Sequence, residues 1–305
     1  MKHLLTIFDL TKEEIEGVIY RAAVLKAILK EDIPYVPLTG KTLGLIFDKS
    51  STRTRVSFEV AMHQLGGSSI FISPGESQIG RGEPVKDTVR VLSRFVDALV
   101  IRTYAQETIE EFARYAKVPV INGLTNLCHP CQILSDLFTI YDKKGRYEGI
   151  KIVWIGDGNN MAHSWLKAAA RLGLNLTLAC PEGYEPDMNL IEEAQKEAGS
   201  KIRLINDPYE AVKGADVVNT DVWVSMGQEE EREERLKAFQ GYQVNEELLK
   251  RAKRNCIVMH CLPAHRGEEI TDDVIESKNS VIFDQAENKL YMHRAILEKL
   301  LVKQT

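Results

Sequence analysis

The segment SSTRTR, residues 50–55, concentrates the kinds of side chain that bind oxyanions. The hydroxyl groups of Ser51, Thr52 and Thr54 can donate hydrogen bonds to anion oxygens. The guanidinium of Arg53 can donate to two such oxygens at once. Because the apolar run LGLIF precedes the segment, we expect these donors at the end of a buried strand. The pattern therefore predicts an oxyanion site, most simply for phosphate.

A structural alternative explains part of the same segment. Ser50 or Ser51 would cap a helix, and Arg55 would pair with Glu59 one turn later. This alternative accounts for one serine and one arginine and leaves the remaining donors without a role.

Three more polar residues follow apolar runs in the first half of the chain. Arg102 follows DALVI, and the motif HPCQ contains His129 and Gln132. Pro130 suits the first position of a helix, so this motif is expected to open one. Taken singly, Arg102 would more often form a surface ion pair, and His129 would more often be a buried, hydrogen-bonded imidazole. Together with the first segment they predict one shared ligand site.

The second half of the chain carries two comparable motifs. DVWVSMG begins at Asp221, whose carboxylate can bind a cationic group, and its residues 225–227 are expected to form a turn that presents backbone donors. HCLP places Cys261 directly after the apolar run CIVM. Each motif is also compatible with an ordinary loop at the end of a strand.

Zinc binding is a possible use of several of these residues. The possible ligands by type are Cys128, His129, Cys131, His260, Cys261 and His265. The sequence has one C-x₂-C pair and no second close pair, whereas zinc sites typically use two. His260 and Cys261 are adjacent on an expected strand end, so we expect them to point to opposite sides. The sequence therefore predicts no metal.

A nicotinamide cofactor is a second alternative, because IVWIGDGNNMAHS resembles a strand–glycine–helix turn. It supplies Gly156 and Gly158 but has Met161 where a third glycine is expected. No acidic residue ends the next apolar run, LTLAC, to hold a ribose. The turn is better suited to line a small substrate with Asn159 or Asn160, and no organic cofactor is predicted.

Composition limits the class of protein. The 305 residues are 44% hydrophobic and 27% charged, which is typical of a globular protein. The formal net charge of −5 argues against a broad nucleic-acid surface. The N-terminal residues do not resemble a signal peptide, and no apolar run approaches the length of a membrane span, about 18 residues. Five cysteines, an odd number, favour a reducing cytoplasm over a disulfide framework.

Short apolar runs alternate with helical patterns along the chain. Thr11 is expected to cap an amphipathic helix over residues 12–30, and further helices begin near Arg53, Glu83, Glu107 and Pro130. The expected strands are TLGLIF, SSIFI, DALVIR and VPVIN in the first half, and IKIVWIG, NLTLAC, IRLI, DVVNT, CIVMH and SVIFD in the second. The alternation predicts an α/β protein with two doubly wound parallel-sheet domains that have helices on both faces.

The expected domains are residues 1–143 and 148–286, joined near the turn-rich segment 141–149. A last helix, residues 288–305, is expected to return to the first domain. The charged run EEEREERLK, residues 229–237, is typical of a solvated helical face with ion pairs four residues apart.

Five motifs taken in order, STRTR, HPCQ, DVWVSMG, HCLP and FDQAEN, resemble the signatures of the aspartate/ornithine carbamoyltransferase family. The resemblance runs from about residue 5 to residue 302. It implies that residues 1–143 bind carbamoyl phosphate and residues 148–286 bind ornithine.

The resemblance also assigns residues to each substrate. For carbamoyl phosphate it implies Ser51, Thr52, Arg53, Thr54, Gln78, Arg102, His129, Gln132, Cys261, Leu262 and Lys289, with Gln78 reaching the site of a neighbouring chain. For ornithine it implies Asn160, Asp221, Ser225 and Met226. The expected catalytic residues are Cys261, Arg102, His129 and Asp221. Lys289 departs from the family, which usually has arginine after AEN, and lysine cannot supply the fork geometry of a guanidinium.

The motifs also indicate the amine that is carbamoylated. Aspartate-specific relatives have a lysine-bearing loop and a proline–leucine pair, where this chain has GRGEP and the pair Cys261 and Leu262. Putrescine-specific relatives lack the SMG turn. The resemblance therefore implies a homo-oligomer, a trimer or a multiple of trimers, that forms citrulline and phosphate from ornithine and carbamoyl phosphate, as in arginine biosynthesis. From the odd number of cysteines we expect it in the cytoplasm. The alternatives are a carbamoyltransferase for putrescine or an N-acylated ornithine, and a non-catalytic binding homologue.

Overall fold

A computed structural model of the chain describes residues 2–73, 75, 82–197 and 201–302. The chain folds into two compact units, which are treated separately below. Unit 1 comprises Met1–Phe138 and Glu287–Thr305, and unit 2 comprises Thr139–Ala286. The chain therefore passes out of unit 1 once and returns to it at the end.

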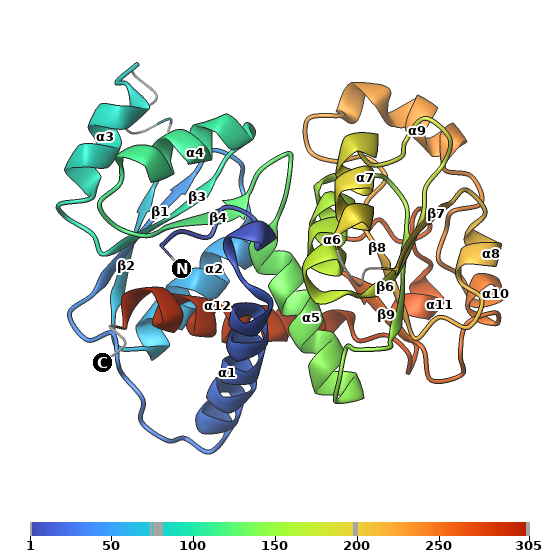
Figure 1. Cartoon of the computed structure of the whole chain (residues 1–305), viewed down its shortest axis with the longest axis horizontal. Coiled ribbons are helices and arrows are strands. Elements are labelled where there is room, and N and C mark those ends of the chain that lie inside the picture. The colour runs from blue at the N-terminus through green and yellow to red at the C-terminus, as the bar shows by residue number, and fades with distance from the viewer. Residues whose placement is uncertain (1, 74, 76–81, 198–200, 303–305) are drawn as a thin grey trace. The chain divides into compact units, whose positions relative to one another are not determined.

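Unit 1 contains a parallel sheet with the strand order β2-β1-β3-β4 among its described residues. The strands are β1 Thr42–Phe47, β2 Ser68–Ile72, β3 Ala98–Arg102 and β4 Val120–Leu124. The helices are η1 Ile7–Asp9, α1 Lys12–Lys30, α2 Thr52–Gln64, α3 Val85–Leu92, α4 Gln106–Tyr115, the first part of α5 Pro130–Lys144, and most of α12 Ile282–Leu301. Within this unit, α3 and α4 lie on one face of the sheet, and α1, α2 and α12 lie on the other (Figure 1).

The strand order creates a topological switch point between β1 and β3. The connection from β1 leads to β2 on one side, whereas the chain then crosses back to β3 on the other side. Because parallel crossovers are right-handed, the two connections leave the sheet on opposite faces and diverge at the carboxyl ends of these strands. Phe47 pairs with Arg102 at this end. The segment SSTRTR and Arg102 therefore begin from neighbouring strand ends.

Helices α1 and α12 complete unit 1 on the face that also carries α2. Thr11 and Glu14 form a capping box at the start of α1, as the sequence predicts. Glu298 of α12 accepts hydrogen bonds at 3.0 Å from the Nε of Arg21, and Arg294 Nη1 donates to the carbonyl of Leu25 at 3.1 Å. The expected return of the last helix to the first domain is confirmed.

Unit 2 contains a parallel sheet with the strand order β7-β6-β5-β8-β9 among its described residues. The strands are β5 Lys151–Ile155, β6 Asn175–Ala179, β7 Lys201–Ile205, β8 Val217–Thr220 and β9 Ile257–His260. The helices are α6 Asn160–Leu172, α7 Met188–Lys196, α8 Pro208–Ala211, η4 Glu229–Glu231, α9 Arg232–Ala238, α10 Glu246–Leu249 and α11 Asp272–Ile275. Here the switch point lies between β5 and β8, where the loops after Ile155 and Thr220 leave the sheet.

The prediction of a strand over the run SVIFD is wrong. Within the run SVIFD, Ser280 forms only an isolated bridge with Val258, and α12 begins two residues later at Ile282. Val281 and Ile282 are buried, whereas Phe283 is exposed. A short apolar run of this kind is compatible with a strand or with the buried start of a helix, and length alone does not separate them. The last helix therefore starts earlier than the expected residue 288.

The prediction of a doubly wound α/β fold with two parallel sheets is confirmed. Among the described residues no helix combines the length and the apolar character needed to span a membrane.

Candidate functional site

In unit 1 the switch point gathers the segment SSTRTR into the first turn of α2. Ser51 is the N-cap of this helix, and its hydroxyl accepts from the N–H of Thr54 at 3.2 Å. Arg55 donates to Glu59 at 2.9 Å. The capping and pairing that the sequence offers as a structural alternative are thus both present, and they coexist with exposed donors on Thr52 and Arg53. The Arg53 guanidinium makes no hydrogen bond or ion pair with any residue that the structure describes.

Three buried cations surround this helix end. Arg102, at the end of β3, donates from Nε to the carbonyl of Lys49 at 3.1 Å and is 5% exposed. Lys49 donates to Asn126 Oδ1 at 2.9 Å. Lys289, on α12, donates to Thr54 Oγ1 at 3.0 Å. Positive charge that is held away from water at a helix N-terminus favours an anionic ligand.

Sequence reasoning missed Lys49. The available signal was its position, because it lies two residues after the end of the buried run LGLIF. A lysine next to six residues rich in donors is easily read as part of a solvated loop. The structure instead buries it, with the ammonium 4.8 Å from the ring centroid of Tyr104.

His129 and Gln132 enter the same cluster from the start of α5. Burial holds the pKa of His129 well below its ordinary value, and the positive charges of Lys289, Arg102 and His293 lower it further. His129 is therefore neutral at physiological pH and can act as a hydrogen-bonding group, rather than as a charged acid.

Lys289 also connects the cluster through Gln132. Its ammonium donates to Gln132 Oε1 at 3.0 Å, while Gln132 Nε2 donates to the buried carboxylate of Asp136 at 2.8 Å. A single ammonium thus joins the first turn of α2 to α5. Lys289 thus stands where the family usually has arginine, and its ammonium lacks the planar fork of a guanidinium.

In unit 2 the switch point gathers Asp221, Cys261 and the loop before α6. Asp221 follows β8 and is 9% exposed. Its Oδ1 accepts from Cys261 Sγ at 3.0 Å, and its Oδ2 accepts from Asn159 Nδ2 at 3.4 Å. Asn159 also caps α6, and Asn160 is the first residue of that helix. A buried carboxylate framed by polar groups is suited to bind an ammonium group.

The Ser225–Gly227 segment forms the expected turn, with the N–H of Gln228 donating to the carbonyl of Ser225 at 3.0 Å. Two of its backbone donors are engaged by side chains: Ser225 N by Gln228 Oε1 at 3.1 Å, and Gly227 N by Glu229 at 3.0 Å. Met226 is 48% exposed at the tip.

His260 supports the turn that carries Cys261 and Leu262. The N–H of Leu262 donates to His260 Nδ1 at 2.9 Å, so Nδ1 accepts and Nε2 carries the ring proton. Nε2 lies 3.0 Å from Glu269 Oε1, and both side chains are 0% exposed. Leu262 has a φ of 60°, a left-handed conformation that is costly for a branched residue. The bond to His260 therefore holds the turn in a conformation that the chain would otherwise avoid.

The expectation that His260 and Cys261 point to opposite sides is wrong. Ligand atoms of Asp221, His260 and Cys261 all lie within 4.8 Å of one another. Strand β9 ends at His260, so the alternation of side chains no longer applies to Cys261 in the turn that follows. By type and distance these three groups could hold a metal ion.

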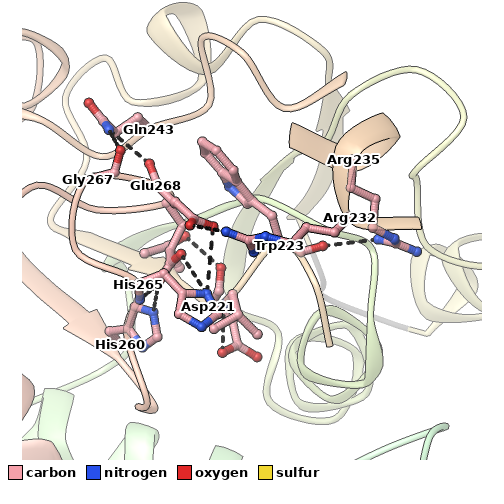
Figure 2. A network of polar contacts seen from close by, with 12 residues as sticks. Asp221, Trp223, Arg232, Arg235, Gln243, His260, His265, Gly267 and Glu268 are labelled. Carbon is pink, nitrogen blue, oxygen red and sulfur yellow. Dashed lines mark hydrogen bonds and ion pairs between the residues drawn. The ribbon is translucent and has the colours of Figure 1, made fainter. Parts of the chain in front are cut away.

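Figure 2 includes a polar contact that sequence reasoning did not anticipate, between Arg235 and Trp223. Arg235 belongs to the charged run expected to be solvated, yet it is 6% exposed. Its Nη1 donates to the carbonyl of Trp223 at 3.1 Å and lies 3.3 Å from Asp157 Oδ2. It also pairs with Glu231 at 2.8 Å. The arginine therefore ties the segment after Asp221 to the loop after β5.

Burial raises the pKa of Asp157 to about 6; Arg235 opposes the shift and Asp221 adds to it. Asp157 lies at the carboxyl end of β5, two residues before Asn159, and is 7% exposed. Asp157 stands between Gly156 and Gly158, and the glycine spacing alone gives no sign that this carboxylate is buried.

The structure thus places the expected residues in two sets, one in each unit. Unit 1 holds Ser51, Thr52, Arg53, Thr54, Arg102, His129, Gln132 and Lys289; unit 2 holds Asn160, Asp221, Ser225, Met226, Cys261 and Leu262. Gln78 lies outside the described residues. The role of each residue toward a substrate stays a prediction.

Two models of known protein families match the chain. One, described as "Aspartate/ornithine carbamoyltransferase, carbamoyl-P binding domain", matches residues 2–142. The other, described as "Aspartate/ornithine carbamoyltransferase, Asp/Orn binding domain", matches residues 148–300. Together they cover nearly the whole chain.

Individual relatives are similar over almost their full length. The chain is 57% identical over 300 residues to the ornithine carbamoyltransferase of Syntrophus aciditrophicus, covering 98% of this chain and 99% of the relative. It is 54% identical over 305 residues to that of Archaeoglobus fulgidus, covering 100% and 99%. The solved structure of ornithine carbamoyltransferase from Pyrococcus furiosus superimposes with a TM-score of 0.95 at 51% identity, covering 100% and 98%.

The buried carboxylate of Asp157 predicts a pH dependence of stability. Its folded-state pKa of about 6 lies above the unfolded value, about 3.9, so the folded chain holds this proton more tightly. The contribution to stability is complete below the unfolded pKa and is lost as the pH rises through the folded pKa. Between pH 5 and 7.5, wild type should lose on the order of 1 kcal/mol relative to Asp157→Asn.

Thermal unfolding of both proteins at the two pH values measures this difference. Glu193→Gln on α7, an exposed carboxylate, is the matched control and should follow wild type. A constant difference between wild type and Asp157→Asn across this range would contradict the assignment.

Proposed function

The chain belongs to the aspartate/ornithine carbamoyltransferase family, and from this membership we propose that it transfers the carbamoyl group of carbamoyl phosphate to the δ-amine of L-ornithine. The products are L-citrulline and phosphate. The observation that supports ornithine as the acceptor is the buried carboxylate of Asp221, with Cys261 and Asn159 on either side. A carboxylate attracts the α-ammonium group of ornithine and would repel the second carboxylate of aspartate.

Carbamoyl phosphate is proposed to bind at the cationic cluster of unit 1. The N–H groups and hydroxyls at the start of α2, with Arg53 and Arg102, would hold the phosphate. The neutral imidazole of His129 would donate to the carbamoyl oxygen, and Gln132 and Lys289 would complete this region. A neutral imidazole polarises a carbonyl group without giving up its proton.

Ornithine is proposed to bind at the switch point of unit 2. Asp221 and Asn160 would hold the α-amino and α-carboxylate groups, with the turn at Ser225 and Met226. Cys261 would lie next to the amine. Ornithine must bind with a neutral δ-amine, because an ammonium group has no lone pair for attack, and its solution pKa is close to that of lysine, about 10.

The proposed reaction is a direct displacement at the carbamoyl carbon. The amine lone pair forms the new C–N bond, and negative charge accumulates on the carbamoyl oxygen, where positioned donors stabilise it. The C–O bond to phosphate then breaks, and the proton released by the amine ends on the leaving phosphate. This sequence balances without a metal or an organic cofactor. We also propose that the reaction serves arginine biosynthesis. The test is whether the gene restores growth without arginine to a strain that lacks ornithine carbamoyltransferase activity.

Arg53→Ala tests the phosphate site. Its exposed guanidinium has no other partner among the described residues, so its loss should chiefly affect carbamoyl phosphate. We expect kcat/KM for carbamoyl phosphate to fall by the equivalent of about 3 kcal/mol, as for a removed electrostatic donor. Citrulline formation is the measurement.

Arg55→Ala is the matched control for this variant. Arg55 lies two residues away but is engaged by Glu59 at 2.9 Å and lies 3.6 Å from the ring centroid of Phe71. Its loss should leave most of the activity. Similar losses in both variants would point to a damaged helix, and wild-type kinetics in Arg53→Ala would end the assignment.

Asp221→Asn tests the choice of ornithine. The change keeps the size of the side chain and removes the charge that would pair with the α-ammonium. We expect kcat/KM for ornithine to fall about tenfold to a hundredfold, the range for a lost charged hydrogen bond. Carbamoyl phosphate affinity, measured by calorimetry without ornithine, should stay near that of wild type; losses of equal size for both substrates would contradict the role.

We further propose a cytoplasmic homotrimer in which Gln78 completes the site of a neighbouring chain. A ring of three chains needs a heterologous contact that closes, which is what a shared site requires. An Arg53→Ala chain and a Gln78→Ala chain should then complement each other. After unfolding and reassembly of an equal mixture, about one site in four receives both undamaged halves. A reassembled mixture that stays as inactive as its components would show that each site is built from one chain. The cytoplasmic location is tested separately, by cell fractionation.

A further inference from the structure

A second cluster of possible metal ligands lies in unit 2, on the loop that follows the HCLP turn. The Nδ1 of His265 and carboxylate oxygens of Glu268 and Glu269 lie within 4.8 Å of one another. We call these three residues the His265 cluster. The expected substrate residues do not include any of them.

Two oxygens of this cluster are buried without a hydrogen bond. Oε2 of Glu268 and Oε2 of Glu269 each have no hydrogen-bond partner among the residues that the structure describes. The Glu269 side chain is 0% exposed. Both oxygens are directed toward His265 Nδ1, at 3.8 Å from Glu268 and 3.9 Å from Glu269. A buried carboxylate oxygen that accepts no hydrogen bond is costly, so this arrangement favours a cationic ligand.

The other oxygen of each carboxylate is already engaged, which fixes the orientation of both groups. Glu269 Oε1 lies 3.0 Å from Nε2 of His260 and accepts from the N–H of His265 at 2.6 Å. Glu268 Oε1 accepts from Arg232. Neither carboxylate can therefore rotate freely to satisfy Oε2 elsewhere.

The backbone of the loop is held from a neighbouring segment. Figure 2 shows the amide of Gln243 beside Gly267 and Glu268, and its Nε2 donates to their carbonyls at 2.8 and 2.9 Å. The N–H of Val244 donates to the carbonyl of Glu269 at 2.8 Å. The ligands therefore project from a loop of fixed conformation, which reduces the ordering that binding would require.

The simplest alternative to a bound cation is a protonated His265 imidazole that balances the charge of the two carboxylates. The separations of 3.8 and 3.9 Å are too long for hydrogen bonds from Nδ1 to either carboxylate. They are close to the separation of ligands around a tetrahedral zinc ion, about 3.4 Å for metal–ligand bonds near 2.1 Å. All three atoms lie within 4.8 Å of one another, so a contraction of at most about 1.4 Å would bring them into the coordination sphere.

We propose that His265 Nδ1, Glu268 Oε2 and Glu269 Oε2 bind a divalent cation of the zinc class, with water at the remaining position. Imidazole nitrogens and carboxylate oxygens are both zinc ligands, and a site with three protein ligands leaves a fourth position for water. The His265 side chain is 43% exposed and gives the ion a path from solvent. Glu269 also contacts His260, which accepts from the N–H of Leu262. The ion would therefore be linked to the turn at Leu262 through these two side chains.

The test must separate this site from Asp221, His260 and Cys261, whose ligand atoms also lie within 4.8 Å of one another. The Cys261→Ser chain, free of affinity tags and treated with chelator, removes the thiolate ligand of that second set. Calorimetric titration of this chain with Zn²⁺ should give one ion per chain. Adding His265→Asn or Glu268→Gln should weaken binding about tenfold or more, because each removes a ligand.

His63→Asn is the matched control, since it removes an exposed imidazole from unit 1 and should leave Zn²⁺ affinity unchanged. Failure of the Cys261→Ser chain to bind Zn²⁺, or equal affinity after His265→Asn, would overturn the proposal. If Cys261→Ser does not fold, Co²⁺ titration of the wild-type chain decides. A bound Co²⁺ spectrum without thiolate charge-transfer bands, lost in His265→Asn, supports the site, and a spectrum unchanged by that variant overturns it. No substrate is present, so either result leaves the proposed transferase activity to its own tests.

Discussion

Right-handed crossovers force the loops on either side of a switch point to diverge, and this constraint determines where unit 1 and unit 2 can place functional groups. In each sheet a pair of adjacent strands ends where no crossover covers it. In unit 1 the pair is β1 and β3, and in unit 2 it is β5 and β8. Helices α2 and α6 begin directly after the first strand of each pair, so their N-termini add unpaired N–H groups to the same position.

The two switch points are chemically opposite although the folds around them are alike. The one in unit 1 is bordered by the buried cations Lys49, Arg102 and Lys289. The one in unit 2 is bordered by the buried acids Asp157 and Asp221. Local charge, rather than the formal net charge of −5, therefore determines which ligand each unit favours. In both units the charged groups are held by hydrogen bonds to neighbouring loops, which limits the reorganisation needed when a ligand arrives.

The sequence predicted the elements of the fold, and it placed most candidate site residues at the ends of strands, because both depend on local patterns. Apolar runs of five or six residues defined strands such as β1, and the donors of SSTRTR followed directly. The burial of Arg235 was not predictable in this way. Its neighbours in sequence are charged and exposed, and its partner Asp157 lies 78 positions earlier in the chain. Pairing over such a distance depends on tertiary contacts that no local pattern encodes.

The start of α12 illustrates the second kind of limit. The run SVIFD satisfies the composition of a strand, and one residue of it, Ser280, does bridge to Val258. The following residues continue as helix, with Val281 and Ile282 buried and Phe283 exposed, a distribution that only the folded chain reveals. The orientation of Cys261 relative to His260 depended in the same way on where β9 ends, a boundary that sequence patterns locate only approximately.

The bond between Lys289 and Thr54 has a consequence for biosynthesis. The two residues are 235 positions apart, and all of unit 2 is encoded between them. A ribosome must therefore translate the whole of unit 2 before the residue that completes the cationic cluster of unit 1 exists. A nascent chain that has reached only residue 286 has the sheet of unit 1 and the start of α2, but neither the ammonium of Lys289 nor the remainder of α12. Assembly of the cationic cluster is thus one of the last events in the synthesis of the protein, and a chain that terminates before Lys289 cannot complete it.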